Sequence, residues 1–447
     1  MLSKVLVATA VAGLGALAVL ATAPRFAALL LIGAAFLSGI GIAVGEMTMR
    51  PEQVAGLLVA GHLLLRAQGL RIPRVTLLVG AWLSLGMLSA LGESGTNRAA
   101  QHLVRLAMTT VPVFALPLLL PSGQAARRGW DSYVWCGALA SAGGVIAMAS
   151  HELLGTDFGV THEATLDYVN AQGTLLEPNL LGSLAAAVGI ALLLRLTDGE
   201  LGVRGRALAA LGLLVSGVAL AASMTRAAWL AFPPLAAGAW VIAPVDRARR
   251  RLRAARLALS GVALAAGVAL VVPSLQAQRP SDFRTGLAGR VTSLVRLEDD
   301  QNLGVRFRRF DRALAEWQRR PLFGAGHGAM ERLAGEEDNR LAWTGNLEVH
   351  LLVDTGVAGL LLILGFFVAT GMHLAKRLRC ACDALDRRYA VEQLAAVAML
   401  FLCSQMTDSS WLASFWVTLG LVHAGVAPVD RRRPVAEAAS AARAPAP

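Results

Sequence analysis

Residues 347–375 read LEVHLLVDTGVAGLLLILGFFVATGMHLA, and this stretch decides the fold class. From Gly356 onward it contains no Asp, Glu, Lys or Arg over about 20 residues, the length that a helix needs to cross ~30 Å of hydrocarbon. Similar stretches recur along the chain, which is 55% hydrophobic and only 16% charged. A soluble domain is nearer to about 25% charged. The sequence therefore predicts an all-α, polytopic integral membrane protein.

The apolar stretches predict about 12 (12–13) transmembrane helices. The first is not expected to be a cleaved signal peptide, because another apolar stretch follows at once. The approximate bounds are 4–22, 26–45, 52–70, 75–92, 102–121, 131–153, 175–196, 206–224, 226–244, 256–274, 347–375, 389–406 and 409–427.

Basic residues orient the predicted helices. They crowd the short loops 245–255 and 376–388 and return at Arg431–Arg433, and basic residues in short loops mark the cytoplasmic side. The long segment 275–345 then lies outside, and the N-terminus lies inside with twelve spans or outside with thirteen. This placement accounts for the net charge of +11, so we expect no nucleic-acid partner. The tail 431–447 is Ala/Pro-rich and is expected to be disordered.

The outer segment 275–345 contains twelve arginines, no lysine and ten acidic residues. Arginine suits bidentate binding of phosphate or carboxylate, although a GC-rich genome would also explain the scarcity of lysine. Within this segment, apolar residues recur at helical spacing and predict an amphipathic helix over 306–318. That helix lies on the outer membrane surface, caps a cavity between spans, or is a purely structural lid. The stripe comprises Phe307, Phe310, Leu314 and Trp317.

Pro321 is expected to end this helix, and Gly324, Gly326 and Gly328 to form a tight turn after it. The sequence Gly-Ala-Gly-His-Gly lacks the Lys and Ser/Thr of a phosphate-binding loop. We therefore expect no nucleotide site there.

The beginning of span 347–375 carries the next polar cluster. Asn346, His350 and Asp354 are four residues apart, so a helix would place them on one face over about 12 Å. Ionisable groups at membrane depth are functional candidates. Histidine can act as a general base near neutral pH, and a carboxylate can orient it or accept the proton itself. The alternative is an interfacial helix end that packs against the outer segment.

Two earlier positions are expected at the same face. Arg226 follows a very tight hairpin at Ser223 and needs an anionic partner from the protein or from a ligand. Pro178-Asn179 begins the span at 175. The preceding loop 154–174 lacks the H-x-x-x-H spacing of a helical metal site, so we expect no metal ligand and no cofactor. Its candidate donors are His151 at the loop's edge, Asp157, His162, Glu163 and Asp167.

Four motifs in this order resemble the O-antigen ligase and O-antigen polymerase family (Wzy_C type), membrane glycosyltransferases of the polytopic C type. The resemblance covers roughly residues 170–370. The motifs are Pro178-Asn179, the turn Thr225–Ala228, Arg306 and Trp317 followed by Pro321–Gly326, and Gly345-Asn346 with Asp354, Gly356 and Gly359.

The resemblance implies a metal-independent, inverting glycosyltransferase of the bacterial inner membrane whose site faces the periplasm. The donor is a glycan on undecaprenyl pyrophosphate, and the acceptor is a saccharide or is lipid-linked. His350, Asp354 or Glu348 would deprotonate the acceptor, and arginines would bind the pyrophosphate. These arginines are Arg226, Arg306 and Arg309, and the residues expected to bind substrate are Asn179, Asn346 and Trp317.

The resemblance also divides the chain. N-terminal transmembrane helices occupy 1–170, the ligase-like region with its helical periplasmic loop 275–345 occupies 171–375, and C-terminal transmembrane helices occupy 376–430. The tail follows.

Departures from the family pattern favour a polymerase of repeat units for surface polysaccharide or exopolysaccharide over a ligase that acts on lipid A core. Gly345 stands where family ligases carry their catalytic histidine, and Asp354 replaces the usual glutamate. His350, one helical turn onward, is a candidate substitute. The rival classes are a flippase for lipid-linked oligosaccharide and a non-catalytic assembly protein, and the sequence contains no paired internal repeat of the kind that transporters often show.

Overall fold

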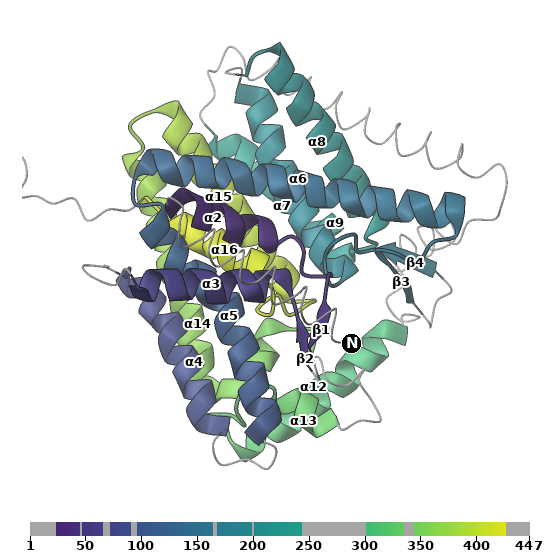
Figure 1. Ribbon diagram of the computed structural model, residues 1–447, viewed down its shortest axis with the longest axis vertical. Coiled ribbons are helices and arrows are strands. Elements are labelled where there is room, and N and C mark those ends of the chain that lie inside the picture. The colour runs from purple at the N-terminus through teal and green to yellow at the C-terminus, as the bar shows by residue number, and fades with distance from the viewer. Residues whose placement is uncertain are drawn as a thin grey trace, which may run out of the picture.

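The computed structural model describes residues 24–44, 47–65, 72–90, 96–163, 168–198, 201–243, 301–334 and 344–425. These residues form a bundle of helices with two short β-hairpins (Figure 1). The predicted spans 4–22 and 256–274, the loop 245–255, most of the outer segment apart from 301–334, and the tail 431–447 lie outside the described residues.

The first half of the described chain contains seven segments. They are α2 (Pro24–Ala34), the β1–β2 hairpin (Ile42–Val44 and Met47–Met49), α3 (Pro51–Leu65), α4 (Leu77–Ala90) after a 3-10 turn, α5 (Thr96–Leu119), α6 (Gly123–Leu154), and the β3–β4 hairpin (Val160–Glu163 and Tyr168–Ala171).

The second half is helical throughout. Its elements are α7 (Pro178–Asp198), α8 (Val203–Ala222), α9 (Arg226–Ile242), α12 (Gln301–Arg319), the short α13 (Ala329–Ala334), α14 (Leu347–Cys380), α15 (Ala384–Ser404) and α16 (Ala413–His423).

The membrane class is supported, but a count of about 12 spans is not confirmed. Among the described residues, five helices are long and apolar enough to cross a bilayer, within α5, α6, α7, α8 and α14. Several other predicted spans form shorter apolar helices, including α2, which ends at Ala34 rather than at 45. The described residues are mostly helical, as expected, and two short antiparallel hairpins lie in segments expected to be helix or loop.

Helix α14 is broken near its first third. Gly356 has φ 63° and ψ −165°, which is not helical. The break frees backbone groups, and the loop that follows α12 binds them. The amide groups of Ala325 and Gly326 donate to the carbonyl oxygens of Val353 and Asp354, each at 2.8 Å, and the amide groups of Val357 and Ala358 donate to the carbonyl oxygens of Pro321 and Leu322 at 2.9 and 3.1 Å.

This exchange attaches residues 320–328, the α12–α13 loop, to the membrane-spanning helix. Backbone groups in hydrocarbon need partners inside the protein, and the loop supplies them. The loop also reaches α4 and α5, because a Cβ atom on Gly326 would lie 2.6 Å from Ala90, and one on Gly328 would lie 2.9 Å from the ring of His102. In Figure 1, α13 accordingly lies beside one end of α5.

A buried ion-pair network joins the other end of the bundle. Glu392 of α15 is fully buried and accepts hydrogen bonds from Trp130 Nε1 of α6 at 2.8 Å and from Arg195 Nη2 of α7 at 2.9 Å. Arg195 also lies 2.9 Å from Asp131 of α6. Because each buried charge has a partner, the network ties three helices together without leaving an isolated ion in an apolar surrounding.

We predict that Gly356→Ala destabilises the protein by on the order of 3 kcal/mol, because the backbone conformation excludes a side chain. The new Cβ atom would also lie 2.4 Å from the backbone of Leu322. Thermal unfolding in detergent measures the loss. Gly371→Ala in the same helix is the matched control, since a Cβ atom at Gly371 meets nothing within 4 Å. Equal melting temperatures for the two variants would refute the account of the break.

Candidate functional site

The centre of the candidate site is a histidine between two carboxylates. His350 Nε2 lies 2.9 Å from Asp354 Oδ2, one turn further along α14. His350 Nδ1 lies 2.7 Å from Asp408 Oδ2, a close ion-pair contact whose angle is poor for a hydrogen bond. The three residues are only 5%, 1% and 7% exposed. The expectation that His350 and Asp354 share a helix face is confirmed, and Asp408 is an unexpected third member.

Asp354 is held by the end of the α12–α13 loop and the first residue of α13. Its carboxylate accepts hydrogen bonds from the backbone amides of Gly328 at 3.2 Å and Ala329 at 3.3 Å, and it lies 3.3 Å from His327 Nδ1. His327 packs edge-on against Trp82 of α4, with the ring centres 4.8 Å apart. Burial lowers the pKa of His327, although the neighbouring Asp354 carboxylate acts in the opposite direction. The Gly-Ala-Gly-His-Gly turn thus positions a carboxylate.

Asp408 comes from the turn between α15 and α16. Its Oδ1 accepts from the backbone amide of Ser410 at 2.9 Å and from the Ser410 hydroxyl at 2.7 Å. Burial alone would raise the pKa of Asp408, but the contact with His350 and the two hydrogen bonds from Ser410 lower it below its ordinary value. A signal was available in the sequence, since Thr407–Ser410 is a polar tetrapeptide between two apolar spans.

Asn346 and Glu348 meet the same turn. Asn346 is the N-cap of α14, so it precedes the helix instead of continuing the face of His350, and its Oδ1 accepts from the amide of Val349 at 2.9 Å. Its Nδ2 donates to the carbonyl oxygen of Gln405 at 3.2 Å. The Gln405 side chain donates to Glu348 Oε1 at 2.7 Å. Both predicted residues therefore lie at the α15–α16 turn.

Glu177 is a further carboxyl group that interacts electrostatically with Asp408. It directly precedes α7 and is half-buried. Burial and the nearby Asp408 carboxylate raise the pKa of Glu177, while Arg309, Arg306 and Arg50 act in the opposite direction. The predicted arginines Arg306 and Arg309 thus act electrostatically on Glu177, which comes from another part of the chain.

Arg306 is anchored at the α15–α16 turn. Its Nη1 donates to the carbonyl oxygen of Met406 at 2.6 Å. A Cβ atom at Gly345 would lie 3.6 Å from the same Nη1. Gly345, which the resemblance aligns with a ligase histidine, therefore lies close to the guanidinium group of Arg306.

The Arg226 hairpin lies against the beginning of α7. The Thr225 hydroxyl is 3.2 Å from the carbonyl oxygen of Pro178, and a Cβ atom at Gly182 would lie 2.5 Å from Thr225. Met224, at the tip, has φ 53°, a left-handed conformation that bulky residues rarely adopt. The structure thus brings together the hairpin and the Pro178-Asn179 motif. The ligand roles of Arg226 and Asn179 stay predictions.

Trp317 connects α12 to the loop that follows it. Its indole Nε1 donates to the carbonyl oxygen of Pro321 at 3.1 Å, and its ring packs on a small buried cluster that includes Ala313, Met330 and Val353. The side chains of Phe307 and Leu314 in the predicted apolar stripe are 61% and 36% exposed. A role of Trp317 in substrate binding stays a prediction.

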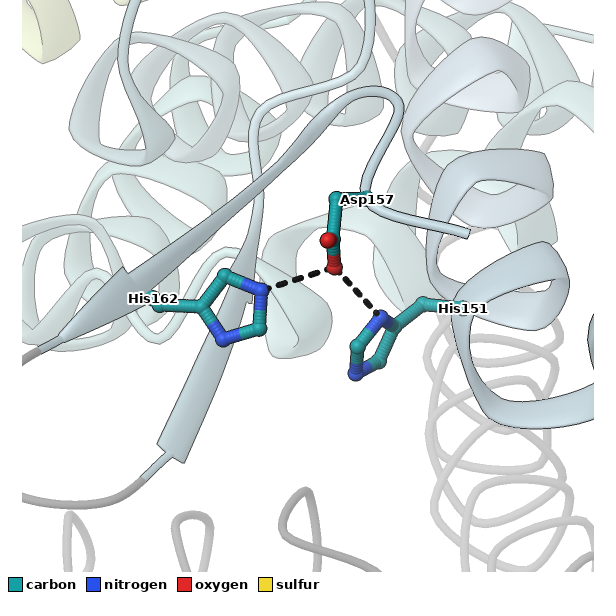
Figure 2. A group of neighbouring side chains, drawn as sticks. All are labelled: His151, Asp157 and His162. Carbon is teal, nitrogen blue, oxygen red and sulfur yellow. Dashed lines mark hydrogen bonds and ion pairs between the residues drawn. The ribbon is translucent and has the colours of Figure 1, made fainter. Parts of the chain in front are cut away.

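Outside this site, the structure gathers three potential metal donors that lack helical metal-site spacing. His151, Asp157 and His162 offer ligand atoms that all lie within 4.8 Å of one another (Figure 2). They come from the end of α6, the loop after it and strand β3. The hairpin supplies the proximity that the linear spacing does not indicate.

Comparison with known families finds a match in the central part of the chain. Residues 211–364 match the family model described as O-antigen ligase, Wzy_C. This match confirms the resemblance over that segment, which contains Arg226, Arg306, His350 and Asp354. The family consists of membrane enzymes of glycosyltransferase type. No curated protein matches the chain.

A double-mutant cycle tests the arrangement around His350. His350→Ala leaves two carboxylates buried without the imidazole between them, so adding Asp408→Asn should cost less stability than the same change in the wild type. We expect a coupling free energy of about 1–3 kcal/mol in detergent unfolding.

The matched control for this cycle pairs His350→Ala with Asp386→Asn. Asp386 lies at the beginning of α15, near Arg127 and away from the α15–α16 turn. This pair should be additive. Additivity of the His350 and Asp408 changes would contradict the contact.

Proposed function

We propose that the chain is an inverting glycosyltransferase that transfers or polymerises a glycan carried on undecaprenyl pyrophosphate, at the periplasmic face of a bacterial inner membrane. The acceptor is a saccharide hydroxyl. The observation that carries this proposal is the buried Asp408–His350–Asp354 line beside Arg306 and Glu177, within and next to the segment that matches O-antigen ligases.

The chemistry requires charge stabilisation more than covalent catalysis. The acceptor oxygen forms a bond to the anomeric carbon as the bond from that carbon to the pyrophosphate oxygen breaks. Negative charge grows on the leaving pyrophosphate, and preorganised arginines stabilise it without reorganisation. Arg306, Arg309 and Arg226 are the proposed groups, and no step assigned to them needs a metal ion.

Deprotonation of the acceptor hydroxyl requires a base, and the contacts of His350 and Asp354 favour a different residue, Glu177, for this role. Both ring nitrogens of His350 face carboxylates, and Asp354 is occupied by the loop amides. We therefore assign His350 and Asp354 to positioning. Glu348, which Gln405 binds, stays a prediction as base. Glu177 is half-buried, lies near the arginines and has a raised pKa, as expected of a catalytic base.

A polymerase is favoured over a ligase acting on lipid A core. Family ligases carry histidine at the position of Gly345, where this chain has no side chain beside Arg306. In our proposal the glycine at 345 changes how the acceptor is bound. Binding of the donor is not changed, because the arginines proposed to bind its pyrophosphate are present.

One observation bears on the rival flippase. Transporters often contain broken helices that bind substrate at midplane, and α14 is broken at Gly356. Here the outer loop occupies the backbone groups of the break. We therefore favour glycosyl transfer.

Arg306→Ala should lower glycosyl transfer on the order of 10²-fold or more, because the leaving pyrophosphate loses a preorganised cation. The assay uses purified protein in proteoliposomes with lipid-linked repeat units, and offers either further units or lipid A core as acceptor. Arg308→Ala is the control, since this exposed arginine lies on the same helix. Unchanged turnover of Arg306→Ala would overturn its role, and lipid movement without bond formation by the wild type would indicate a flippase.

The pH profile tests Glu177. A carboxylate base works only when deprotonated, so kcat/KM should rise with pH along a limb centred above the ordinary pKa of glutamate. Glu177→Gln should lose about 10²–10⁴-fold in rate together with this limb. Glu177→Asp should keep the limb. Glu316→Gln, which removes a carboxylate on α12, is the control. A limb that persists in Glu177→Gln would assign the base elsewhere.

A further inference from the structure

We propose that His151, Asp157 and His162 form a binding site for a borderline divalent cation, Zn²⁺ being the best fit, which joins the end of α6 to the β3–β4 hairpin. This site is separate from the transfer site. Two imidazoles and one carboxylate are the donors that Zn²⁺ takes in three-ligand sites, where water fills the fourth position. The cluster is the one group of this kind among the residues that the structure describes.

The distances suit a small cation. Asp157 Oδ1 lies 2.8 Å from His162 Nε2 and 3.5 Å from His151 Nδ1 (Figure 2). Donor atoms around a tetrahedral Zn²⁺ lie roughly 3.4 Å apart, given metal–ligand bonds of about 2.1 Å. The rings of the two histidines are near perpendicular, with centres 5.4 Å apart. The side chains of Asp157 and His162 are 71% and 57% exposed, so they have room to rotate toward an ion bound at His151.

The backbone that carries these residues is already fixed. The hairpin packs closely against α6, because a Cβ atom at Gly159 would lie 2.8 Å from Ala147, and one at Gly173 would lie 2.7 Å from the backbone of Gly144. Val160 and Val169 of the hairpin are buried. The chain therefore does not have to fold around the ion to bring the donors together, which reduces the entropic cost of binding.

Zinc binding would change one contact of His151. Its Nδ1 lies 3.1 Å from the carbonyl oxygen of Thr156. Because Nδ1 is also the ring nitrogen that faces Asp157, at 3.5 Å, a bond to the ion would replace the contact with Thr156. The loop after α6 begins at Gly155, whose φ of 68° turns the chain so that Thr156 and Asp157 come back beside His151.

The hairpin connects this site to α7. After β4, the Thr174 hydroxyl donates to the carbonyl oxygen of Phe36 at 2.7 Å, and the chain then reaches Glu177 within three residues. A cation bound at the hairpin would thus stabilise the segment that leads to the beginning of α7. We expect a structural role for the ion rather than a part in bond making.

Metal binding by the full-length protein tests this inference directly. The protein is purified through a tag without histidine, treated with chelator, and titrated with Zn²⁺ against a fluorescent chelator. We expect one equivalent to bind and to raise the melting temperature. His162→Ala and Asp157→Asn should each weaken binding at least 10-fold and remove the thermal shift. Co²⁺ should give a tetrahedral absorption spectrum that both variants lack.

Glu152→Gln is the matched control, because Glu152 neighbours His151 in α6 but is not one of the three donors. Its affinity should equal that of the wild type. Absence of stoichiometric Zn²⁺ binding, or equal binding by His162→Ala and the wild type, would overturn the proposal. None of these readouts depends on glycosyl transfer, so the proposed function can fail without affecting the result.

Discussion

The rest of the structure depends on the exchange of backbone hydrogen bonds at the break in α14. The amide and carbonyl groups of a membrane-spanning helix normally bind one another within the helix, because hydrocarbon provides no hydrogen-bond donors or acceptors. At Gly356 this rule is met by another segment, because residues 321–326 bind the groups on both sides of the break. The exchange fixes the position of the α12–α13 loop against α14. His327 and the amides that hold Asp354 follow directly from that placement.

A second constraint is that charged groups in an apolar surrounding need partners. The two ends of the helix bundle meet this constraint differently. Around Glu392 the acidic and basic groups pair within a closed network of α6, α7 and α15. Around His350 three carboxyl groups and several arginines come from distant parts of the chain and include the half-buried Glu177. The first arrangement stabilises the bundle. The second leaves charge near a half-exposed position, which is typical of sites that bind an ionic ligand.

The sequence predicted the helical membrane class, the tight hairpin before Arg226, the helix around Arg306, and the shared face of His350 and Asp354, because each depends on local spacing. It did not predict Asp408 or Arg50 as neighbours of the site, since their proximity depends on how distant helices pack. Glu177 directly precedes the Pro178-Asn179 motif, but no local pattern indicates that its carboxyl group will be half-buried. The two hairpins were missed for a similar reason: short strands among apolar residues resemble helix or loop. The contact of His327 with Asp354 was not predicted either, because the glycine-rich sequence around it was compared only with a phosphate-binding loop.

Asp408 lies beyond residue 364, where the family match ends, yet it completes the contacts of His350. The turn between α15 and α16 also holds Arg306 and Asn346 through its carbonyl oxygens. During synthesis these partners leave the ribosome only after every earlier span has been made. The nascent chain therefore carries an incomplete set of polar contacts around His350 until the α15–α16 turn has been synthesised, so the site is assembled only after the segment that matches the family is complete.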